Sequence, residues 1–215
     1  MNNQIYAVFG LGRYGRAVAT ELVRNGAEVL AVDANQSIVN AAAAELPVCK
    51  CADVTEKEAL SRLGIANIDT VVIAMAGRLE SSVMATLLCK EAGVKNVIVK
   101  CATEMHSKIL SRVGADRVIL PENESGIRLA KNLTSAGFVD VIDLSDDVSM
   151  VELDVRADWT GKTLAELGLR RKYSINVMGV RRGDSVSINV DPNVPLEADT
   201  RLIVIANTEK LKKLK

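Results

Sequence analysis

The chain has 215 residues, and 48% of them are hydrophobic, which is enough to bury a sizeable core in one large domain or two small ones. Its 27 Lys and Arg residues balance 27 Asp and Glu residues, so it lacks the basic surplus of a protein that binds nucleic acid. No apolar run reaches the roughly 20 residues that cross a bilayer, and the polar start at residues 1–4 does not resemble a signal peptide, which predicts a cytoplasmic protein.

The first predicted unit is a strand, a glycine-rich turn, a helix and a second strand. An apolar strand at residues 5–9 leads into Gly10, Gly12 and Gly15 in the GxGxxG spacing, and a helix at residues 13–25 follows. The first glycine permits a tight turn, the second lets phosphates approach the backbone, and the third lets the helix pack close to the strand. Because the helix N-terminus would direct unpaired N–H groups at phosphates, the pattern predicts a nucleotide-binding βαβ unit.

Asp33 ends the second predicted strand, at residues 28–33, and indicates which ribose the pocket accepts. A carboxylate at this position can accept hydrogen bonds from both hydroxyls of an unmodified ribose. A 2′-phosphate would lie against its charge, so a phosphorylated ribose is disfavoured. The alternative is that the glycines serve only the close packing of helix on strand.

The βα pattern continues to residue 120. We predict further strands at residues 48–51, 70–74, 96–100 and 117–120, and helices between them at 56–63, 79–92 and 104–113. Asp53 or Thr55 can cap the helix at 56–63, and Gly64 follows that helix as a stop signal. Six strands that alternate with helices predict an α/β fold with a Rossmann-like, doubly wound parallel sheet.

After residue 137 the pattern changes to short strands with turn signals. We predict strands at residues 139–144, 150–155, 176–181, 185–190 and 201–206, a hairpin turn at 182–184 and a brief helix at 164–167. The chain should therefore have a domain at residues 1–134 and a small α+β domain at 135–215. An amphipathic helix at residues 122–133 would connect them and could transmit motion, or act as a plain rigid linker.

Residues suited to catalysis are sparse. A dehydrogenase of this fold needs a second domain that supplies an acid or base and a substrate pocket. The single histidine, His106, lies on a predicted helix beside the fifth strand, and residues 135–215 contain no His or Cys and no catalytic carboxylate pair. The four cysteines lie in apolar patterns typical of reduced core residues. We therefore predict a nucleotide sensor and not an enzyme.

Several polar residues follow strands of the predicted sheet at its carboxyl edge, where ligands bind in this fold. Asp53 follows the third strand, residues 74–78 follow the fourth, Lys100 ends the fifth and Glu122 follows the sixth. A nucleotide across that edge could contact Asp53 near its base, Gly77 near its phosphates and Lys100 as a counter-charge. Each residue alone has a plain alternative role as a cap, turn or surface charge.

Six motifs of the chain together suggest a family. They are Gly10-Leu-Gly-Arg-Tyr-Gly15, Leu30-Ala-Val-Asp33, Val71-Val-Ile-Ala74, Val99-Lys100, Gly114-Ala-Asp-Arg-Val-Ile-Leu-Pro-Glu122 and Tyr173-Ser-Ile-Asn-Val-Met-Gly-Val-Arg-Arg-Gly183. With these motifs the chain resembles the RCK (regulator of potassium conductance) domains of Ktr/Trk-type potassium uptake systems. The resemblance implies an RCK N-terminal and an RCK C-terminal domain. It also implies a cytoplasmic gating subunit, closest to the Ktr type, at the inner face of the membrane. Such subunits form homodimers and octameric rings under a membrane potassium-translocating subunit.

The resemblance also implies a nucleotide switch in the first domain. With the residues at the carboxyl edge, the expected site is Gly10, Leu11, Gly12, Arg13, Tyr14, Gly15, Asp33, Asp53, Ala74, Gly77, Lys100 and Glu122. Arg13 matches an arginine that senses the terminal phosphate across the dimer interface, and Lys100 matches a phosphate-side lysine. Glu122 matches an acidic residue that helps to hold a cation, Mg²⁺ or Ca²⁺, between ATP-loaded protomers.

The identity of the nucleotide stays open at this point. ATP and ADP are the expected ligands, and NAD or NADH, which Trk-type relatives sense, is the alternative. Asp33 tolerates either ligand, because both present a ribose with free hydroxyls. An NAD-dependent oxidoreductase is the less favoured third reading.

The second domain resembles a module that binds cyclic di-AMP at its dimer interface in Gram-positive relatives. The matching residues are Arg170, Ile175, Asn176, Val177 and Pro192. A guanidinium suits a phosphate, an amide suits a base edge, and apolar walls suit stacking. Arg171 and Lys172 add charge, and Ser174 stands where relatives often have glycine. The alternative is a dimer interface without this ligand.

Overall fold

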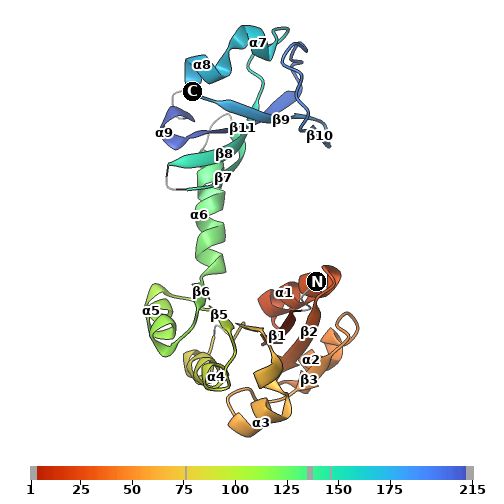
Figure 1. Cartoon of the computed structure of the whole chain (residues 1–215), viewed down its shortest axis with the longest axis vertical. Coiled ribbons are helices and arrows are strands. Elements are labelled where there is room, and N and C mark those ends of the chain that lie inside the picture. The colour runs from red at the N-terminus through yellow and green to blue at the C-terminus, as the bar shows by residue number, and fades with distance from the viewer. Residues whose placement is uncertain (1–3, 76, 135–137, 146, 212–215) are drawn as a thin grey trace. The chain divides into compact units, whose positions relative to one another are not determined.

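The computed structural model describes residues 4–75, 77–134, 138–145 and 147–211, and it contains two compact units, Met1–Glu122 and Asn123–Lys215 (Figure 1). The division falls inside helix α6 (Pro121–Thr134), whereas the sequence places the domain boundary after this helix. None of the described α6 residues is buried, and its large apolar side chains are exposed. The domain boundary at residues 134 and 135 therefore stays a prediction.

The first unit contains a six-stranded sheet in which every strand pair is parallel. Its strands are β1 (Ile5–Phe9), β2 (Glu28–Asp33), β3 (Cys49–Cys51), β4 (Thr70–Ile73), β5 (Asn96–Lys100) and β6 (Arg117–Ile119). They lie in the order β3-β2-β1-β4-β5-β6, so β1 and β4 are neighbours at the point where the order reverses. This topology confirms the predicted Rossmann-like fold class, and it opens a crevice at the carboxyl ends of β1 and β4.

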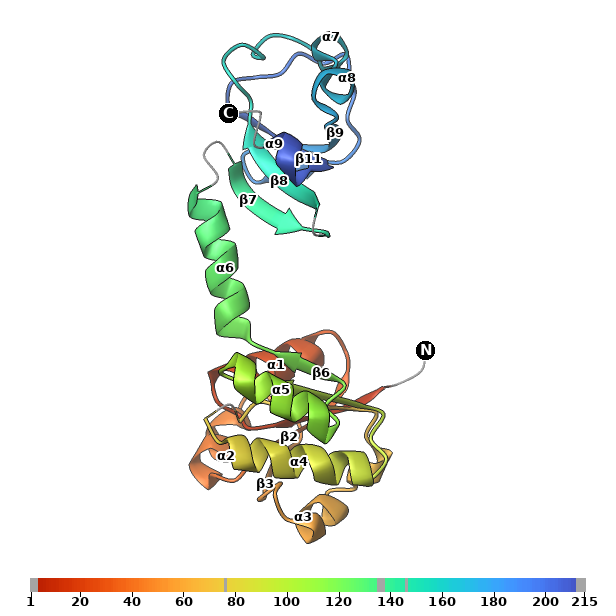
Figure 2. The same cartoon turned by 90° about the vertical axis from the view of Figure 1, so that its left-hand side faces the viewer.

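Helices cover both faces of this sheet. They are α1 (Arg13–Arg24), α2 (Gln36–Ala42), α3 (Lys57–Arg62), the 3-10 helix η1 (Ile65–Asn67), α4 (Leu79–Glu91) and α5 (Glu104–Val113). Figure 2 shows α4 and α5 side by side on one face. Phe9 packs with Leu60, Ala85 and Leu110 from α3, α4 and α5, whereas its neighbour Val8 packs with residues of α1 and α2. This alternation, with both neighbours buried, explains why β1 reads as a continuous apolar run.

Two local predictions in this unit are wrong. Helix α3 begins at Lys57 with Glu56 as its N-cap, and neither Asp53 nor Thr55 caps it. Instead, Asp53 Oδ1 accepts hydrogen bonds from the backbone N–H and the hydroxyl of Thr55, at 2.9 and 2.7 Å, because an aspartate readily bonds the residue two places on. Cys51 is exposed and not a core residue, because β3 is an edge strand.

The second unit contains an antiparallel five-stranded sheet in the order β10-β9-β11-β8-β7. Its elements are β7 (Phe138–Asp143), β8 (Val148–Asp154), α7 (Leu164–Leu167), α8 (Leu169–Tyr173), β9 (Asn176–Arg182), β10 (Ser185–Ser187), β11 (Thr200–Asn207) and α9 (Thr208–Leu211). Leu202 and Val204 of β11 are fully buried and pack with Trp159, whose ring lies 6.5 Å from that of Tyr173. The small α+β domain is thereby confirmed.

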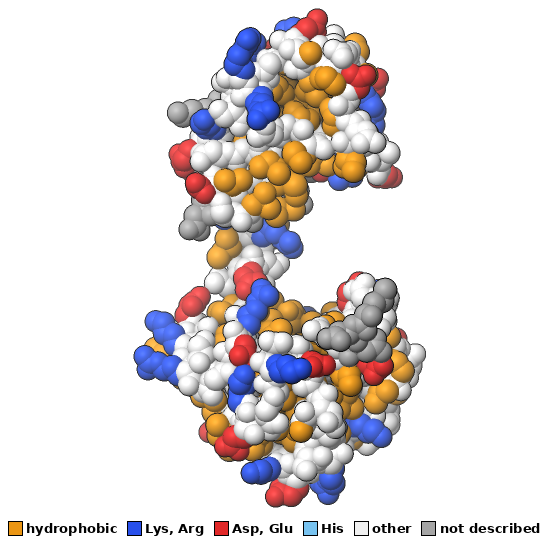
Figure 3. Space-filling view, viewed as in Figure 1, with side chains coloured by type: hydrophobic (Ala, Val, Ile, Leu, Met, Phe, Trp, Pro, Cys, Tyr) orange, Lys and Arg blue, Asp and Glu red, His pale blue; other side chains and the backbone are white. Residues whose placement is uncertain are grey.

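The surface carries both signs of charge in close mixture. On the face drawn in Figure 3, blue and red side chains alternate over both units, as the zero net charge suggests. Within the described ranges, no helix is both long enough and apolar enough to span a membrane.

Candidate functional site

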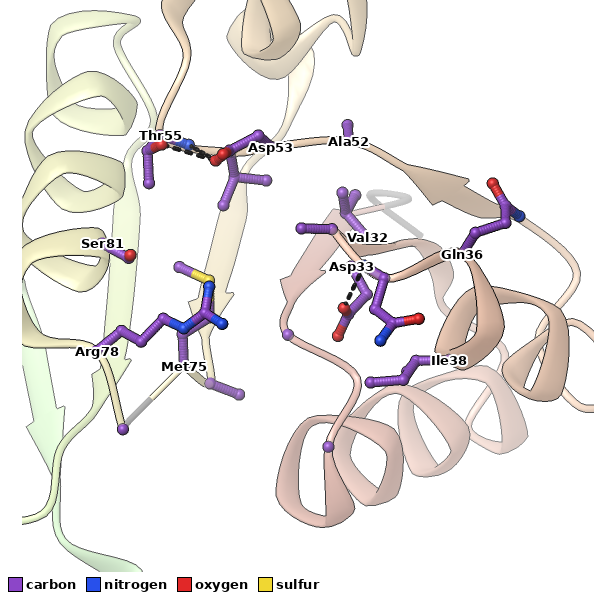
Figure 4. Close-up of a pocket in the computed structure, with 17 residues that line it drawn as sticks. Val32, Asp33, Gln36, Ile38, Ala52, Asp53, Thr55, Met75, Arg78 and Ser81 are labelled. Atoms are coloured by element: carbon purple, nitrogen blue, oxygen red, sulfur yellow. Dashed lines mark hydrogen bonds between the residues drawn. The ribbon is translucent and has the colours of Figure 1, made fainter.

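A cavity of about 770 Å³ lies at the carboxyl edge of the parallel sheet, where β1 and β4 are neighbours (Figure 4). This volume is within the range of cofactor pockets. The residues that line it are Gly10, Gly12, Val32, Asp33, Ala34, Asn35, Gln36, Ile38, Ala52, Asp53, Val54, Thr55, Ala74, Met75, Gly77, Arg78 and Ser81. They come from the carboxyl end of β2 and from the segments that follow β1, β2, β3 and β4, including the first residues of α2 and α4, so four separate parts of the chain build one pocket.

The glycine turn forms the floor of the cavity. Gly10 adopts a φ of +87°, which side chains disfavour, and its N–H donates to the carbonyl of Val32 at 2.8 Å. A Cβ at Gly15 would lie only 1.9 Å from the carbonyl oxygen of Gly10, so α1 packs against the turn only because this residue is glycine. At Gly12, by contrast, no described atom lies within 4 Å of a Cβ position, which leaves open space in front of the α1 N-terminus.

Asp33 is held rigidly at the rim of this turn. Its Oδ2 accepts a hydrogen bond from the N–H of Leu11 at 2.7 Å, and its Oδ1 accepts one from the N–H of Asn35 at 2.9 Å. Asn35 in turn caps α2, because its side chain accepts from the N–H of Ser37. The carboxylate therefore ties the glycine turn to the start of α2, and its remaining lone pairs are available to ribose hydroxyls.

Asp53 and Arg78 lie on the other walls of the cavity. Hydrogen bonds from Thr55 hold the pKa of Asp53 below its ordinary value, and the nearby charge of Arg78 lowers it further. Figure 4 shows the Arg78 side chain entering the cavity from the wall opposite Asp33. Sequence reasoning placed Arg78 in the turn after β4 but chose only Ala74 and Gly77 from that turn. The missed signal is an arginine at the start of a helix, where a small polar residue is expected.

The twelve predicted nucleotide residues divide into three groups in the structure. Six of them line the cavity: Gly10, Gly12, Asp33, Asp53, Ala74 and Gly77. Leu11 is buried behind the turn, and Gly15 serves the packing of α1. The other four, Arg13, Tyr14, Lys100 and Glu122, do not line this cavity.

Lys100, Glu122 and Tyr14 form a separate cluster at the ends of β5 and β6. Lys100 Nζ lies 2.6 Å from Glu122 Oε1 and 5.3 Å from the centre of the Tyr14 ring. The ion pair with Lys100 is the main reason that the pKa of Glu122 lies below its ordinary value, and the charge of Arg13 contributes. Arg13 itself is exposed. The positive charges of Lys100 and Arg13 therefore both act on the carboxylate of Glu122.

The predicted cation at Glu122 does not fit the residues of one chain. Among the described residues, no group of three or more His, Cys, Asp or Glu side chains is arranged to hold a metal ion. Glu122 alone offers fewer oxygen ligands than Mg²⁺ or Ca²⁺ requires, and it already bonds Lys100.

A second cavity, of about 650 Å³, lies in the C-terminal unit beside α7, α8 and β9. It is lined by Leu164, Ala165, Gly168, Leu169, Arg170, Arg171, Ile175, Asn176, Val177, Met178, Val190 and Pro192. All five residues predicted for the second ligand are in this set. None of the described lining residues is acidic, and two are arginines, so the cavity suits an anion with apolar faces. Their role in binding stays a prediction.

Ser174 directly precedes Ile175, which lines the second cavity, but it does not line that cavity itself. It adopts a φ of +56° directly after α8, the left-handed conformation for which glycine is better suited. Its hydroxyl accepts a hydrogen bond from Lys210 Nζ of α9 at 2.8 Å. Ser174 is the one described residue other than glycine with a positive φ.

Comparison with known proteins identifies relatives over the whole chain. Residues 6–121 match the TrkA-N domain and residues 148–215 match the TrkA-C domain. The chain is 34% identical over 213 residues to Ktr system potassium uptake protein A of Bacillus subtilis (strain 168), covering 99% of this chain and 96% of that protein. It is 36% identical over 206 residues to Ktr system potassium uptake protein A of Vibrio alginolyticus, covering 96% and 94%.

Solved structures with the same fold are more distant in sequence. The GsuK RCK domain aligns with a TM-score of 0.53 at 22% identity over 100% of this chain, which spans 46% of that chain's length. The TrkA-N domain of the inner membrane protein ybaL from Escherichia coli aligns with a TM-score of 0.55 at 12% identity, covering 62% and 98%. At these identities, the likeness concerns the fold alone.

Proposed function

This chain belongs to the family of TrkA-N and TrkA-C domain proteins that regulate Ktr/Trk-type potassium uptake, and from this premise we propose that its first unit is an adenine-nucleotide switch. It is a regulatory subunit, and such subunits act with a membrane protein that translocates potassium. Relatives that are potassium uptake proteins support a regulatory role over an enzymatic one. In the proposed mechanism, ATP and ADP favour different arrangements of the N-terminal units, and the difference reaches the membrane subunit.

The observation that carries the nucleotide proposal is the fixed carboxylate of Asp33 above the glycine turn. Backbone N–H groups of Leu11 and Asn35 orient both of its oxygens, and the cavity in front of it has the volume of a cofactor site. A ribose with free hydroxyls suits this carboxylate, and the open space at Gly12 suits phosphates at the N-terminus of α1.

Gating requires that the two nucleotides bind the two states of the protein with different affinities. A ligand must favour one state by about 1.4 kcal/mol for each tenfold change in population. Arg13 is exposed and does not line the cavity of its own chain, which supports a contact with the terminal phosphate of a nucleotide in a neighbouring protomer. Only ATP has that phosphate, so Arg13 could supply the difference.

Calorimetric titration of the purified chain with ATP, ADP, NAD and NADH tests this proposal. We expect ATP and ADP to bind, each saturating one site per chain. If NAD or NADH binds and neither ATP nor ADP does, the chain would instead be an NAD(H)-sensing regulator. Asp33 suits this alternative as well, because its carboxylate can bind the ribose of either kind of nucleotide. A change in nicotinamide absorbance with a substrate would favour an oxidoreductase.

The second cavity supports a proposal for a second ligand, cyclic di-AMP. Its two arginines suit phosphates, the amide of Asn176 suits a base edge, and its apolar walls suit stacking. Cyclic di-AMP should raise the melting temperature of the chain, which a thermal-shift assay would measure. No shift at saturating ligand would remove this ligand from the proposal.

The proposed assembly is a homodimer that forms an octameric ring at the inner face of the cell membrane, under the potassium-translocating subunit. Family membership is what supports this arrangement. Light scattering of the purified chain with and without ATP would give the mass of the assembly. A mass that corresponds to a monomer under both conditions would contradict it.

A further inference from the structure

Arg78 stands directly before helix α4 and has an anchored backbone. Its N–H donates to the carbonyl of Met75 at 3.0 Å, and its own carbonyl accepts from the N–H of Ser82 at 3.0 Å. Ser82 is buried, and its hydroxyl donates to Met75 O at 3.4 Å. The main chain of Arg78 is therefore held on both sides, and only its side chain is free to vary.

An arginine is a poor choice for the N-cap position that Arg78 occupies. Its side chain makes no capping hydrogen bond, whereas Ser, Thr, Asp or Asn would satisfy a free N–H of the first turn. Its positive charge also lies at the positive end of the helix dipole. Since helix formation does not explain this residue, its presence points to the cavity that it lines.

The guanidinium of Arg78 is available for a ligand. Among the described residues, no carboxylate lies within ion-pairing distance of it. Asp53, whose pKa the charge of Arg78 lowers, accepts its hydrogen bonds from Thr55. Of the described residues that line the cavity, Arg78 is the one cation, beside the two carboxylates of Asp33 and Asp53. An unpaired guanidinium in a nucleotide cavity is suited to bidentate binding of phosphate.

We propose that Arg78 binds the phosphate groups that ATP and ADP share, from within the chain that holds the nucleotide. This inference rests on the proposed nucleotide function. Asp33 occupies the wall opposite Arg78 and suits the ribose, while Gly77, beside Arg78, leaves open space for a phosphate, because no described atom lies within 4 Å of a Cβ there. The N-terminus of α4 adds positive potential at the same place.

Arg78 and Arg13 consequently have different tasks. Arg78 lines the same cavity as Gly10, Gly12 and Asp33, so it contacts phosphates that every adenine nucleotide places near the glycine turn. Arg13 does not line this cavity, and its task concerns the additional phosphate of ATP. Arg78 therefore sets the affinity for both nucleotides, and Arg13 sets the difference between them.

The test is calorimetric titration of the full chain and its Arg78→Gln variant with ATP, ADP and adenosine. Loss of a charge-assisted contact should lower the affinities for ATP and ADP by about ten- to a hundredfold, and by a similar factor for both nucleotides. Adenosine, which has no phosphate, should bind both proteins equally. Arg78→Lys should recover only part of the affinity, because an ammonium cannot bind a phosphate as a fork. Arg62→Gln, at an exposed arginine of α3 outside the cavity, is the matched control and should bind all three ligands as the original chain does.

Three outcomes would overturn the assignment of Arg78. An equal loss for adenosine would mean that Arg78 contacts the base or ribose. A loss of affinity for ATP alone would mean that Arg78 contacts the terminal phosphate. Unchanged affinities for all three ligands would mean that Arg78 contacts no part of the ligand. If the original chain binds no adenine nucleotide, the proposed function fails, and this inference fails with it.

Discussion

Lys100 Nζ lies 2.6 Å from Glu122 Oε1, and this ion pair joins the carboxyl end of β5 to the first turn of α6. The lysine side chain is 13% exposed, whereas the glutamate is 72% exposed. The half-buried lysine thus holds the exposed glutamate in place at the edge where the nucleotide is proposed to bind. The pair anchors the first turn of α6 to the sheet.

Replacing Lys100 should change the titration of Glu122. Lys100 lowers the pKa of Glu122 from its ordinary 4.5, so the ion pair contributes stability above that pH and loses it as the pH falls through the lower folded value. In Lys100→Met, the pKa of Glu122 should rise, which carboxyl NMR titration would detect. The effect on unfolding should be small, because Glu122 is largely exposed and screened by solvent.

The control for this measurement is Lys95→Met. Lys95 pairs with Asp69 at 2.9 Å and has no part in the Glu122 pair. The Lys95→Met variant should leave the pKa of Glu122 unchanged. It should raise the pKa of Asp69, because the hydrogen bond from Lys95 is the main cause that lowers this pKa. An unchanged Glu122 titration in Lys100→Met would contradict the ion pair.

Gly12, before helix α1, and Gly15, within it, should respond differently to alanine. Gly15→Ala places a Cβ 1.9 Å from the carbonyl of Gly10, so the turn or α1 must move, and we expect a loss of about 2 kcal/mol or more in the free energy of unfolding. Gly12→Ala meets no described atom within 4 Å and has a φ of −64°, so it should fold normally. Urea denaturation measures both.

Gly12→Ala should nevertheless weaken nucleotide binding. Its new methyl group would occupy the open space in which phosphates approach the α1 N-terminus. Calorimetric titration of the Gly12→Ala variant with ADP would measure its affinity for this nucleotide. Normal stability together with normal affinity would exclude Gly12 from the phosphate site.

Arg13→Ala should separate the two nucleotides. Because Arg13 is exposed and does not line the cavity, ADP binding should be nearly unchanged in the variant. The additional response to ATP, read as a change in assembly or in potassium uptake with the membrane subunit, should be lost. An equal loss of affinity for ATP and ADP would contradict the proposed role of Arg13.

The cysteines should react with alkylating reagents in the order of their exposure. Cys51 is exposed on the edge strand β3, whereas Cys89 is buried, and burial raises the pKa of its thiol to about 12. At pH 8, iodoacetamide should therefore modify Cys51 first and leave Cys89 unmodified, as peptide mass spectrometry would show. Equal rates would indicate that the helix α4 that carries Cys89 opens frequently.

Much of the fold could be predicted because its signals are local. Strands β1 and β5 and helix α5 have the predicted bounds, since apolar runs and a following glycine define them within a few residues. Strand β10 ends at Ser187, although a strand to residue 190 was predicted. Its pairing with β9 ends at Val180, so the length of this edge strand depends on its partner and not on its own residues.

The sequence by itself determined the nucleotide-type βαβ unit, because the glycines, the helix and Asp33 are close along the chain and their spacing specifies one local geometry. Only the tertiary structure decided that Asp53 and Arg78 share a cavity with Asp33, while Lys100 and Glu122 pair outside it. These residues come from turns after different strands, and all of them were expected at one edge. Which side chains meet at that edge depends on the order β3-β2-β1-β4-β5-β6 and on the direction of each side chain, and residue spacing contains neither.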